Sequence, residues 1–161
     1  MSGAIDLGAD CRIYLDTNVF VEMFERAGPV NKALTQMLAL ADERGVPRFV
    51  TSELALAELL VKPIEQSRHD LIAVYDNITV SNPFLEVVPV GRKILADAAL
   101  LRASQKSIKL PDAIHLTTAA HAGCRYFLTA DRRLKATAQV EILHLDDALS
   151  VALVEALKNA N

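Results

Sequence analysis

Five short apolar segments alternate with longer segments of helical pattern along the 161 residues of this chain. Strands that are apolar throughout are buried on both faces, which is typical of a parallel sheet covered by helices on both sides. The sequence therefore predicts an α/β fold of three layers, α/β/α, with a central parallel sheet of about five strands. The predicted strands are 12–15, 48–50, 85–90, 126–129 and 140–144.

Turn and capping residues divide the remaining segments into seven predicted helices. Ser52 is a favoured N-cap residue, and Pro63 is predicted to end the helix that Ser52 begins. Pro111 suits the first position of a later helix, and Gly123 suits the residue just past the end of that helix. The predicted helices are 19–26, 30–44, 52–61, 67–77, 91–105, 111–122 and 146–158.

The composition is typical of a folded domain. Apolar residues make up 52% of the sequence and charged residues 23%, so we expect residues 1–161 to form a single domain with its own core. A net charge of −3 argues against a general nucleic-acid coat protein. The absence of tryptophan and the low aromatic content argue against a surface that stacks on bases.

No segment has the pattern of a targeting signal or of a membrane span. The first residues lack the basic and apolar regions of a signal peptide, and no stretch approaches the roughly 20 apolar residues of a membrane helix. The two cysteines, Cys11 and Cys124, have no zinc-binding spacing. We therefore expect a reduced, cytoplasmic protein that makes no contact with a membrane.

Four acidic residues lie in or beside apolar segments, where a charge is costly unless it has a partner. Asp16 and Asp131 each follow a predicted strand, while Glu58 lies within a predicted helix. Asp112 comes directly after Pro111, at the start of another helix. Ligands of open parallel sheets bind beyond the carboxyl ends of the strands, so we expect Asp16 and Asp131 to converge there.

Each acid also has a structural explanation of its own. Asp16 is a suitable N-cap for the helix that follows it, and Asp131 for the turn at residues 132–134. Glu58 stands four residues before Lys62, which is the favoured order for an ion pair on a helix. Asp112, in a first helical turn, is favoured by the helix dipole. For each residue taken alone, these alternatives remain open.

Taken together, the four carboxylates predict a site for a hard divalent cation. Like charges raise one another's pKa, so four carboxylates at close range need a cation to stay ionised. Mg²⁺ and Mn²⁺ prefer oxygen ligands and keep part of their water shell. Such an ion generates a nucleophile from water and stabilises charge on a phosphate, so the chemistry implied is hydrolysis of a phosphodiester.

Four short motifs, in this order, resemble those of the PIN domain family, and the resemblance covers nearly the whole chain. PIN domains are metal-dependent ribonucleases with a parallel sheet between helices, and many small ones are VapC-type toxins of toxin–antitoxin pairs. The motifs are Asp16-Thr17-Asn18, Ala57-Glu58-Leu59, Pro111-Asp112-Ala113-Ile114-His115 and Thr129-Ala130-Asp131-Arg132.

Carried over residue by residue, the resemblance implies a catalytic and metal-binding set, a group of supporting residues and several partners. Glu53 is the rival of Glu58, but its place beside Ser52 suits a first-turn acid better. The implied partners are an RNA substrate, a cognate antitoxin and a second copy of the chain in a homodimer, and the cofactor is Mg²⁺ or Mn²⁺. The acidic set comprises Asp16, Glu58, Asp112 and Asp131, supported by hydrogen bonds from Thr17 or Asn18 and from Thr129. The ending Val61-Lys62-Pro63 of the third helix departs from the glycine that many toxin members have there, which leaves the subfamily open.

Basic residues directly follow the last acid. Arg132 and Arg133, with Lys135, are candidates for binding RNA phosphates at the rim of the acidic site, and the alternative is an ordinary solvated helix face. His115, one turn after Asp112, is a candidate for orienting a carboxylate or contacting substrate. The alternative for His115 is a structural, hydrogen-bonded histidine.

Other function classes fit the sequence less well. An aspartyl phosphatase requires a second acid at the position of Asn18, and a dinucleotide-binding enzyme requires a G-x-G motif, which is absent. A receiver-like signalling domain requires an acidic pair, and only Asp10 lies near the first strand. Two alternatives remain within the family: a non-catalytic PIN-like protein-binding module, and an RNA-processing nuclease outside a toxin–antitoxin pair.

Overall fold

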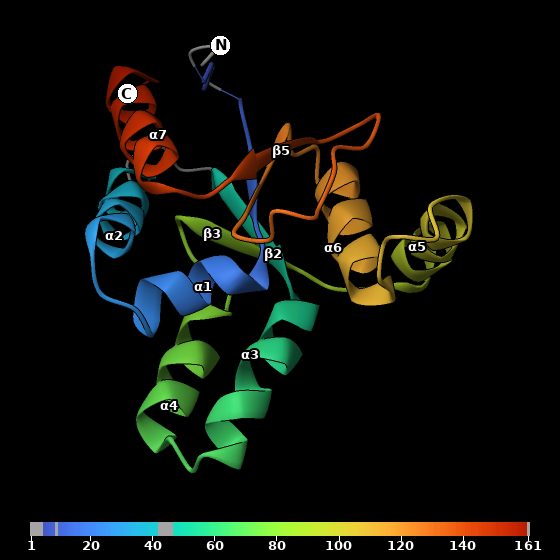
Figure 1. The fold of residues 1–161 in the computed structure, drawn as a ribbon, viewed down its shortest axis with the longest axis horizontal. Helices are drawn as coiled ribbons and strands as arrows, with labels where there is room; N and C mark the ends of the chain where they lie inside the picture. Colours follow the sequence, from blue (N-terminus) through green and yellow to red (C-terminus); the bar gives the residue numbers. More distant parts are fainter. Residues whose placement is uncertain (1–4, 9, 42–46, 161) are drawn as a thin grey trace.

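A central sheet of five parallel strands organises the computed structural model, which describes residues 5–8, 10–41 and 47–160 (Figure 1). Neighbouring strands pair in parallel throughout, as expected from their apolar sequences. Across the sheet the order is β3 (Leu85–Val88), β2 (Phe49–Ser52), β1 (Ile13–Leu15), β4 (Tyr126–Thr129) and β5 (Glu141–His144).

Seven helices cover the two faces of the sheet within the described ranges, and this confirms the predicted three-layer fold. One face packs against α1, α2 and α7, with α3 and α4 extending from this side past the carboxyl end of β2, and the other face packs against α5 and α6 (Figure 1). The helices are α1 (Thr17–Phe24), α2 (Pro29–Ala41), α3 (Glu53–Glu65), α4 (His69–Ile78), α5 (Arg92–Ser104), α6 (Leu110–His121) and α7 (Asp147–Ala160).

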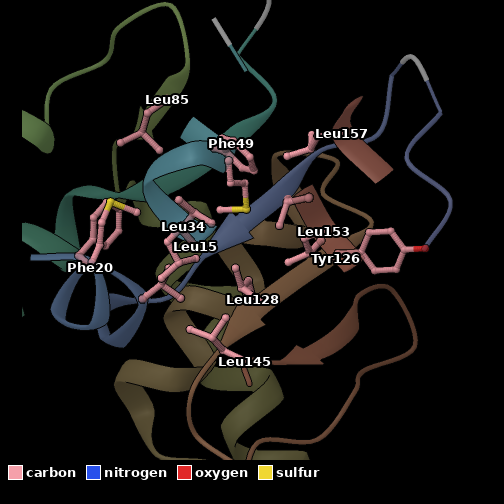
Figure 2. Close-up of a cluster of buried hydrophobic side chains, with 14 of the residues drawn as sticks. Leu15, Phe20, Leu34, Phe49, Leu85, Tyr126, Leu128, Leu145, Leu153 and Leu157 are labelled. Atoms are coloured by element: carbon pink, nitrogen blue, oxygen red, sulfur yellow. The ribbon is translucent and has the colours of Figure 1, made fainter. Parts of the chain in front are cut away.

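The larger hydrophobic core lies between the sheet and α1, α2 and α7. Figure 2 shows Leu15 of β1 and Leu128 of β4 surrounded by side chains such as Leu34 of α2 and Leu153 of α7. Alternate strand residues point to the opposite face, so Tyr14 and Phe127 belong to the smaller core under α6. Both β1 and β4 are therefore buried on both sides, which holds their carboxyl ends rigidly.

The helix that contains Glu58 is longer than predicted. Pro63 does not end α3, which continues to Glu65, because a proline in the last turn removes only one backbone donor. The helix stops before the turn at Ser67, whose φ of 54° is left-handed, and α4 then packs against α3 (Figure 1). The end of the predicted helix 30–44 lies outside the described residues.

Within the part of the chain that the structure describes, no helix is both long enough and apolar enough to cross a membrane.

Candidate active site

The carboxyl ends of β1 and β4 form the floor of the candidate site. These strands are adjacent and in register, with Leu15 opposite Leu128, and the Asp16 amide donates to the Leu128 carbonyl at 3.0 Å. Asp16 comes directly after β1, and Asp131 comes two residues after the end of β4. As predicted from the topology, the two acids lie at the same edge of the sheet.

Asp16 is buried, at 8% exposure, and is fixed by three donors. Its Oδ1 accepts the Thr17 amide at 2.8 Å, while its Oδ2 accepts Asn18 Nδ2 at 2.7 Å and Thr129 Oγ1 at 2.6 Å. Asp16 is thus the N-cap of α1, as the structural alternative predicted. Burial raises the pKa of this carboxyl, and the hydrogen bonds from Thr129 and Thr17 act against that rise.

Asn18 and Thr129 connect the ends of the two strands. Asn18 Nδ2 also donates to Thr129 Oγ1 at 3.0 Å, and Asn18 Oδ1 accepts the Ala130 amide at 2.8 Å. Thr129 Oγ1 in turn accepts the Asp131 amide at 3.0 Å. The side chains predicted to support the site therefore form one network that includes Asp16 and the backbone of Asp131.

Glu58 reaches the site from α3 and contacts two polar side chains. Its Oε2 accepts Thr17 Oγ1 at 2.5 Å and His115 Nε2 at 2.8 Å. Partial burial acts to raise the pKa of Glu58, but the hydrogen bonds from His115 and Thr17 outweigh it and leave the pKa below its ordinary value. Among the described residues Glu58 makes no ion pair with Lys62, so that alternative is wrong.

Asp112 lies in the first turn of α6 and is half-buried. Its carboxylate has no hydrogen-bond or ion-pair partner among the residues that the structure describes. Burial raises the pKa of Asp112, and the negative charges of Asp16 and Asp131 raise it further. Glu58 acts in the same direction, so the other three predicted acids are all within electrostatic reach of Asp112.

Asp131 is paired with Arg133. Its Oδ1 accepts the Arg133 amide and Nε, and its Oδ2 accepts Arg133 Nη2, each at 2.9 Å. The Arg133 side chain and amide lower the pKa of Asp131 to about 2. Asp131 therefore caps the turn that follows it, as the structural alternative predicted.

The basic residues after Asp131 lie in the loop between β4 and β5, so the expected alternative of a helix face is wrong. Arg132 and Arg133 are both exposed, and Arg132 Nη2 pairs with Asp146 Oδ2 at 3.2 Å. Beside this loop a cavity of about 200 Å³ opens next to the two acids. Its lining includes Lys109, Asp112, Asp131, Arg133 and Lys135.

Two polar residues at the site were not predicted to take part in it. Tyr14 OH lies 2.7 Å from His115 Nδ1, and Ser52 Oγ lies 3.5 Å from the same atom. Ser52 occupies the predicted N-cap position of α3, but its side chain makes no capping bond. For Tyr14, the sequence did offer one signal of such a role, because its side chain carries a hydroxyl in the middle of an otherwise apolar strand.

The chemistry of the donor set fits a hard cation, although the side chains are not arranged around one. No three His, Cys, Asp or Glu side chains in the described ranges are placed to hold an ion together. The four acids offer only oxygen donors, which suits Mg²⁺ or Mn²⁺. Glu58 Oε1 and the Asp112 carboxylate have no hydrogen-bond donor among the described residues, and like charges raise the pKa of Asp112, so the residues present fit a cation.

The sequence profile of the PIN domain family matches residues 13–140, from the first residue of β1 to the residue before β5. The chain belongs to the PIN domain family. The matched segment contains all four acids, and the predicted resemblance to this family is confirmed. No curated protein sequence matches this PIN domain protein.

Solved structures of toxins and toxin–antitoxin complexes share the fold of this PIN domain. VapBC2 from Rickettsia felis, bound to a DNA fragment from its promoter, gives a TM-score of 0.64 at 16% identity over 83% of this chain and 98% of the other. DNA-bound VapBC from Salmonella typhimurium gives 0.62 at 17% identity with the same coverage. VapC20 from Mycobacterium tuberculosis, a toxin that cleaves the sarcin–ricin loop, gives 0.58 at 15% identity over 71% of this chain and 86% of the other.

Proposed function

We propose that this PIN domain protein is a metal-dependent endoribonuclease and the toxin of a type II toxin–antitoxin pair. The observation that carries this proposal is the gathering of the four acids at the carboxyl end of the sheet, where Asp112 and Asp131 line one cavity and the three other acids repel Asp112. A protein maintains such repulsion at a cost in stability, and a bound cation removes the cost. Membership of the PIN family and the shared fold of the toxin structures support the same activity.

In this proposal Asp16, Glu58, Asp112 and Asp131 hold Mg²⁺ or Mn²⁺. The ion supplies an activated water and neutralises charge on the phosphate that is cleaved. Thr17, Asn18 and Thr129 contribute by fixing the carboxylates of Asp16 and Glu58 before any ligand binds. Such preorganisation removes the need to reorder these side chains during the reaction.

We also propose that Arg132 and Arg133 bind phosphates of single-stranded RNA at the rim of the site. Both guanidinium groups are exposed on the β4–β5 loop, and both are paired with carboxylates. A cation held by Asp131 would leave the Arg133 guanidinium available for a phosphate group. RNA recognition would then be coupled to occupancy of the metal site.

This coupling gives a prediction for Arg133→Gln. We expect the variant to bind Mn²⁺ up to about fivefold more tightly than the wild type, because an exposed ion pair is worth about 0.2–1 kcal/mol and Arg133 no longer competes for Asp131. Isothermal titration calorimetry of the metal-free proteins measures the affinity. Arg132→Gln is the matched control, since Arg132 pairs with Asp146 instead. Equal affinities in the two variants would contradict the competition.

RNA cleavage tests the activity directly. We expect the wild type to cleave a mixed-sequence single-stranded RNA with Mn²⁺ and to leave the same RNA intact with EDTA. Cleavage that persists in EDTA would overturn the role of the metal. Absence of cleavage in every condition, together with absence of Mn²⁺ binding by calorimetry, would favour a non-catalytic protein-binding module.

The antitoxin, the homodimer and a cytoplasmic site of action are further parts of the proposal. The family resemblance supports all three, and the toxin–antitoxin complexes among the structures that share this fold support the antitoxin. Light scattering of the purified protein is expected to give twice the 17.5 kDa mass of one chain.

Co-expression with small DNA-binding proteins encoded beside this gene tests for the antitoxin, and an active nuclease with no such partner would favour an RNA-processing role.

A further inference from the structure

His115 is buried between two polar groups, the Tyr14 hydroxyl and the Glu58 carboxylate. Packing alone does not explain why these groups face it. The residue is 1% exposed, with Nδ1 2.7 Å from Tyr14 OH and Nε2 2.8 Å from Glu58 Oε2. Tyr14 lies in β1, His115 in α6 and Glu58 in α3, so three separate elements meet in one line of hydrogen bonds. This line ends at an acid of the proposed site, while its other end is in the smaller core.

The directions of these hydrogen bonds follow from the groups themselves. The Glu58 carboxylate is ionised and only accepts, so His115 Nε2 must carry the proton that lies between them. The tautomer with its proton on Nε2 leaves Nδ1 as the acceptor of the Tyr14 hydroxyl proton. Burial keeps the pKa of Tyr14 far above its ordinary value, so the phenol is present as the donor.

We propose that Tyr14 and His115 are positioning residues that orient the Glu58 carboxylate for a divalent cation. This proposal rests on the proposed function for its use of the cation. Thr17 and His115 both donate to Oε2, so Glu58 Oε1 is the oxygen that remains for a ligand. The arrangement resembles the way that outer partners orient the ligands of known metal sites.

Glu58 needs such support more than the other acids do. Its side chain is long, 34% exposed and attached to a helix, and it would otherwise sample many rotamers. Tyr14 is held in turn by its ring, which stacks on Phe127 with centroids 5.0 Å apart and planes 14° apart. Tyr14, fixed by packing in the core, thereby holds His115 in place, and His115 in turn holds the Glu58 side chain at the rim of the site.

Nitrogen NMR of the metal-free protein tests the geometry without any assay of activity. In wild type we expect His115 to show a protonated Nε2 and an unprotonated Nδ1. Tyr14→Phe retains the ring stacked on Phe127 but lacks the hydroxyl, so we expect the Nδ1 signal to shift toward that of an imidazole without this hydrogen bond. An unprotonated Nε2 would overturn the whole proposal, and a protonated Nδ1 would overturn the role of Tyr14.

Two substitutions at His115 separate positioning from packing. His115→Gln retains a donor near the position of Nε2, so we expect Mn²⁺ affinity within about threefold of wild type. His115→Asn is too short to reach Glu58, so we expect an affinity about 10- to 100-fold weaker. Tyr14→Phe, with one neutral hydrogen bond lost, is expected to weaken affinity about fivefold. Calorimetry with Mn²⁺ alone measures all three, and circular dichroism establishes that each variant is folded.

The outcomes distinguish this proposal from the proposed function. Equal Mn²⁺ affinities in folded His115→Gln and His115→Asn would overturn the positioning role while leaving the nuclease intact. If His115→Asn does not fold, a Tyr14→Phe affinity equal to wild type overturns the role of Tyr14 in orienting Glu58. Absence of Mn²⁺ binding in the wild type overturns both the proposed function and the role of Tyr14 and His115 in orienting Glu58 for a cation. The NMR result then still decides whether the hydrogen bonds of His115 exist.

Discussion

Asp112→Asn is expected to cleave RNA at least about a hundredfold more slowly than the wild type, since even an outer-shell partner of a metal costs 10- to 100-fold when removed. The same substitution is expected to leave the metal-free protein equally stable or more stable. Asp112 has no hydrogen-bond donor to lose in the described part of the chain, and its neutralisation removes repulsion from Asp16 and Asp131. Gel-based cleavage rates and thermal melts in EDTA measure the two effects.

Asp112 is a sharper test than Asp16, the most obvious residue to substitute. An amide at position 16 would place donor hydrogens against those of Asn18, Thr129 or the Thr17 backbone, so loss of cleavage there could reflect a damaged fold. Asp76→Asn is the matched control, because Asp76 is an exposed residue of α4 with the same change of charge. A fall in melting temperature for Asp112→Asn would contradict the repulsion argument, and an unchanged cleavage rate would contradict the site.

Divalent metal is expected to stabilise the folded protein strongly. At a free Mn²⁺ concentration a hundred times its Kd, the gain is about 2.7 kcal/mol, which corresponds to a melting temperature about 5–10 °C higher for a protein of this size. Thermal melts in Mn²⁺ and in EDTA measure the shift. Burial and the charges of Asp16 and Asp131 raise the pKa of Asp112, and part of the gain arises because the cation removes the repulsion between these charges.

Asp112→Asn again provides the control for the thermal shift. The variant lacks both a ligand and a source of repulsion, so we expect Mn²⁺ to shift its melting temperature far less than that of the wild type. Arg133→Gln should show a shift at least as large as that of the wild type, because Asp131 is then available. Identical melts of the wild type with metal and with chelator would count against a cation at these four residues.

The elements of this fold were predictable because local patterns determine them. All five strands and seven helices were predicted from apolar runs and caps, with boundaries that differ by a few residues where they lie in the described ranges. Pro63 was misinterpreted because a proline was treated as a helix end wherever it occurs, whereas α3 tolerates one in its last turn. Such boundaries depend on the local turn, here at Ser67, more than on one residue.

The contacts of the site were less predictable than its residues. The topology alone placed Asp16 and Asp131 at one edge of the sheet. The Tyr14–His115 hydrogen bond joins residues 101 positions apart, and no local pattern encodes such a distance. The pairing of Arg133 with Asp131 depends on the conformation of the β4–β5 loop. The alternative stated for Arg132 and Arg133 assumed a helical backbone there. Side-chain partners of this kind are determined by the three-dimensional fold and not by local sequence.

The adjacency of β1 and β4 also determines when the site forms. Thr129 and Asp16 are separated by 113 positions, yet their hydrogen bond joins the two central strands. Contacts between residues so distant in sequence form slowly and late, because a long loop must close first. A ribosome that is still synthesising this chain would therefore carry Asp16 and Glu58 on a segment without a completed site. For a protein proposed to cut RNA, that order of assembly delays activity until Thr129 and Asp131 have left the ribosome.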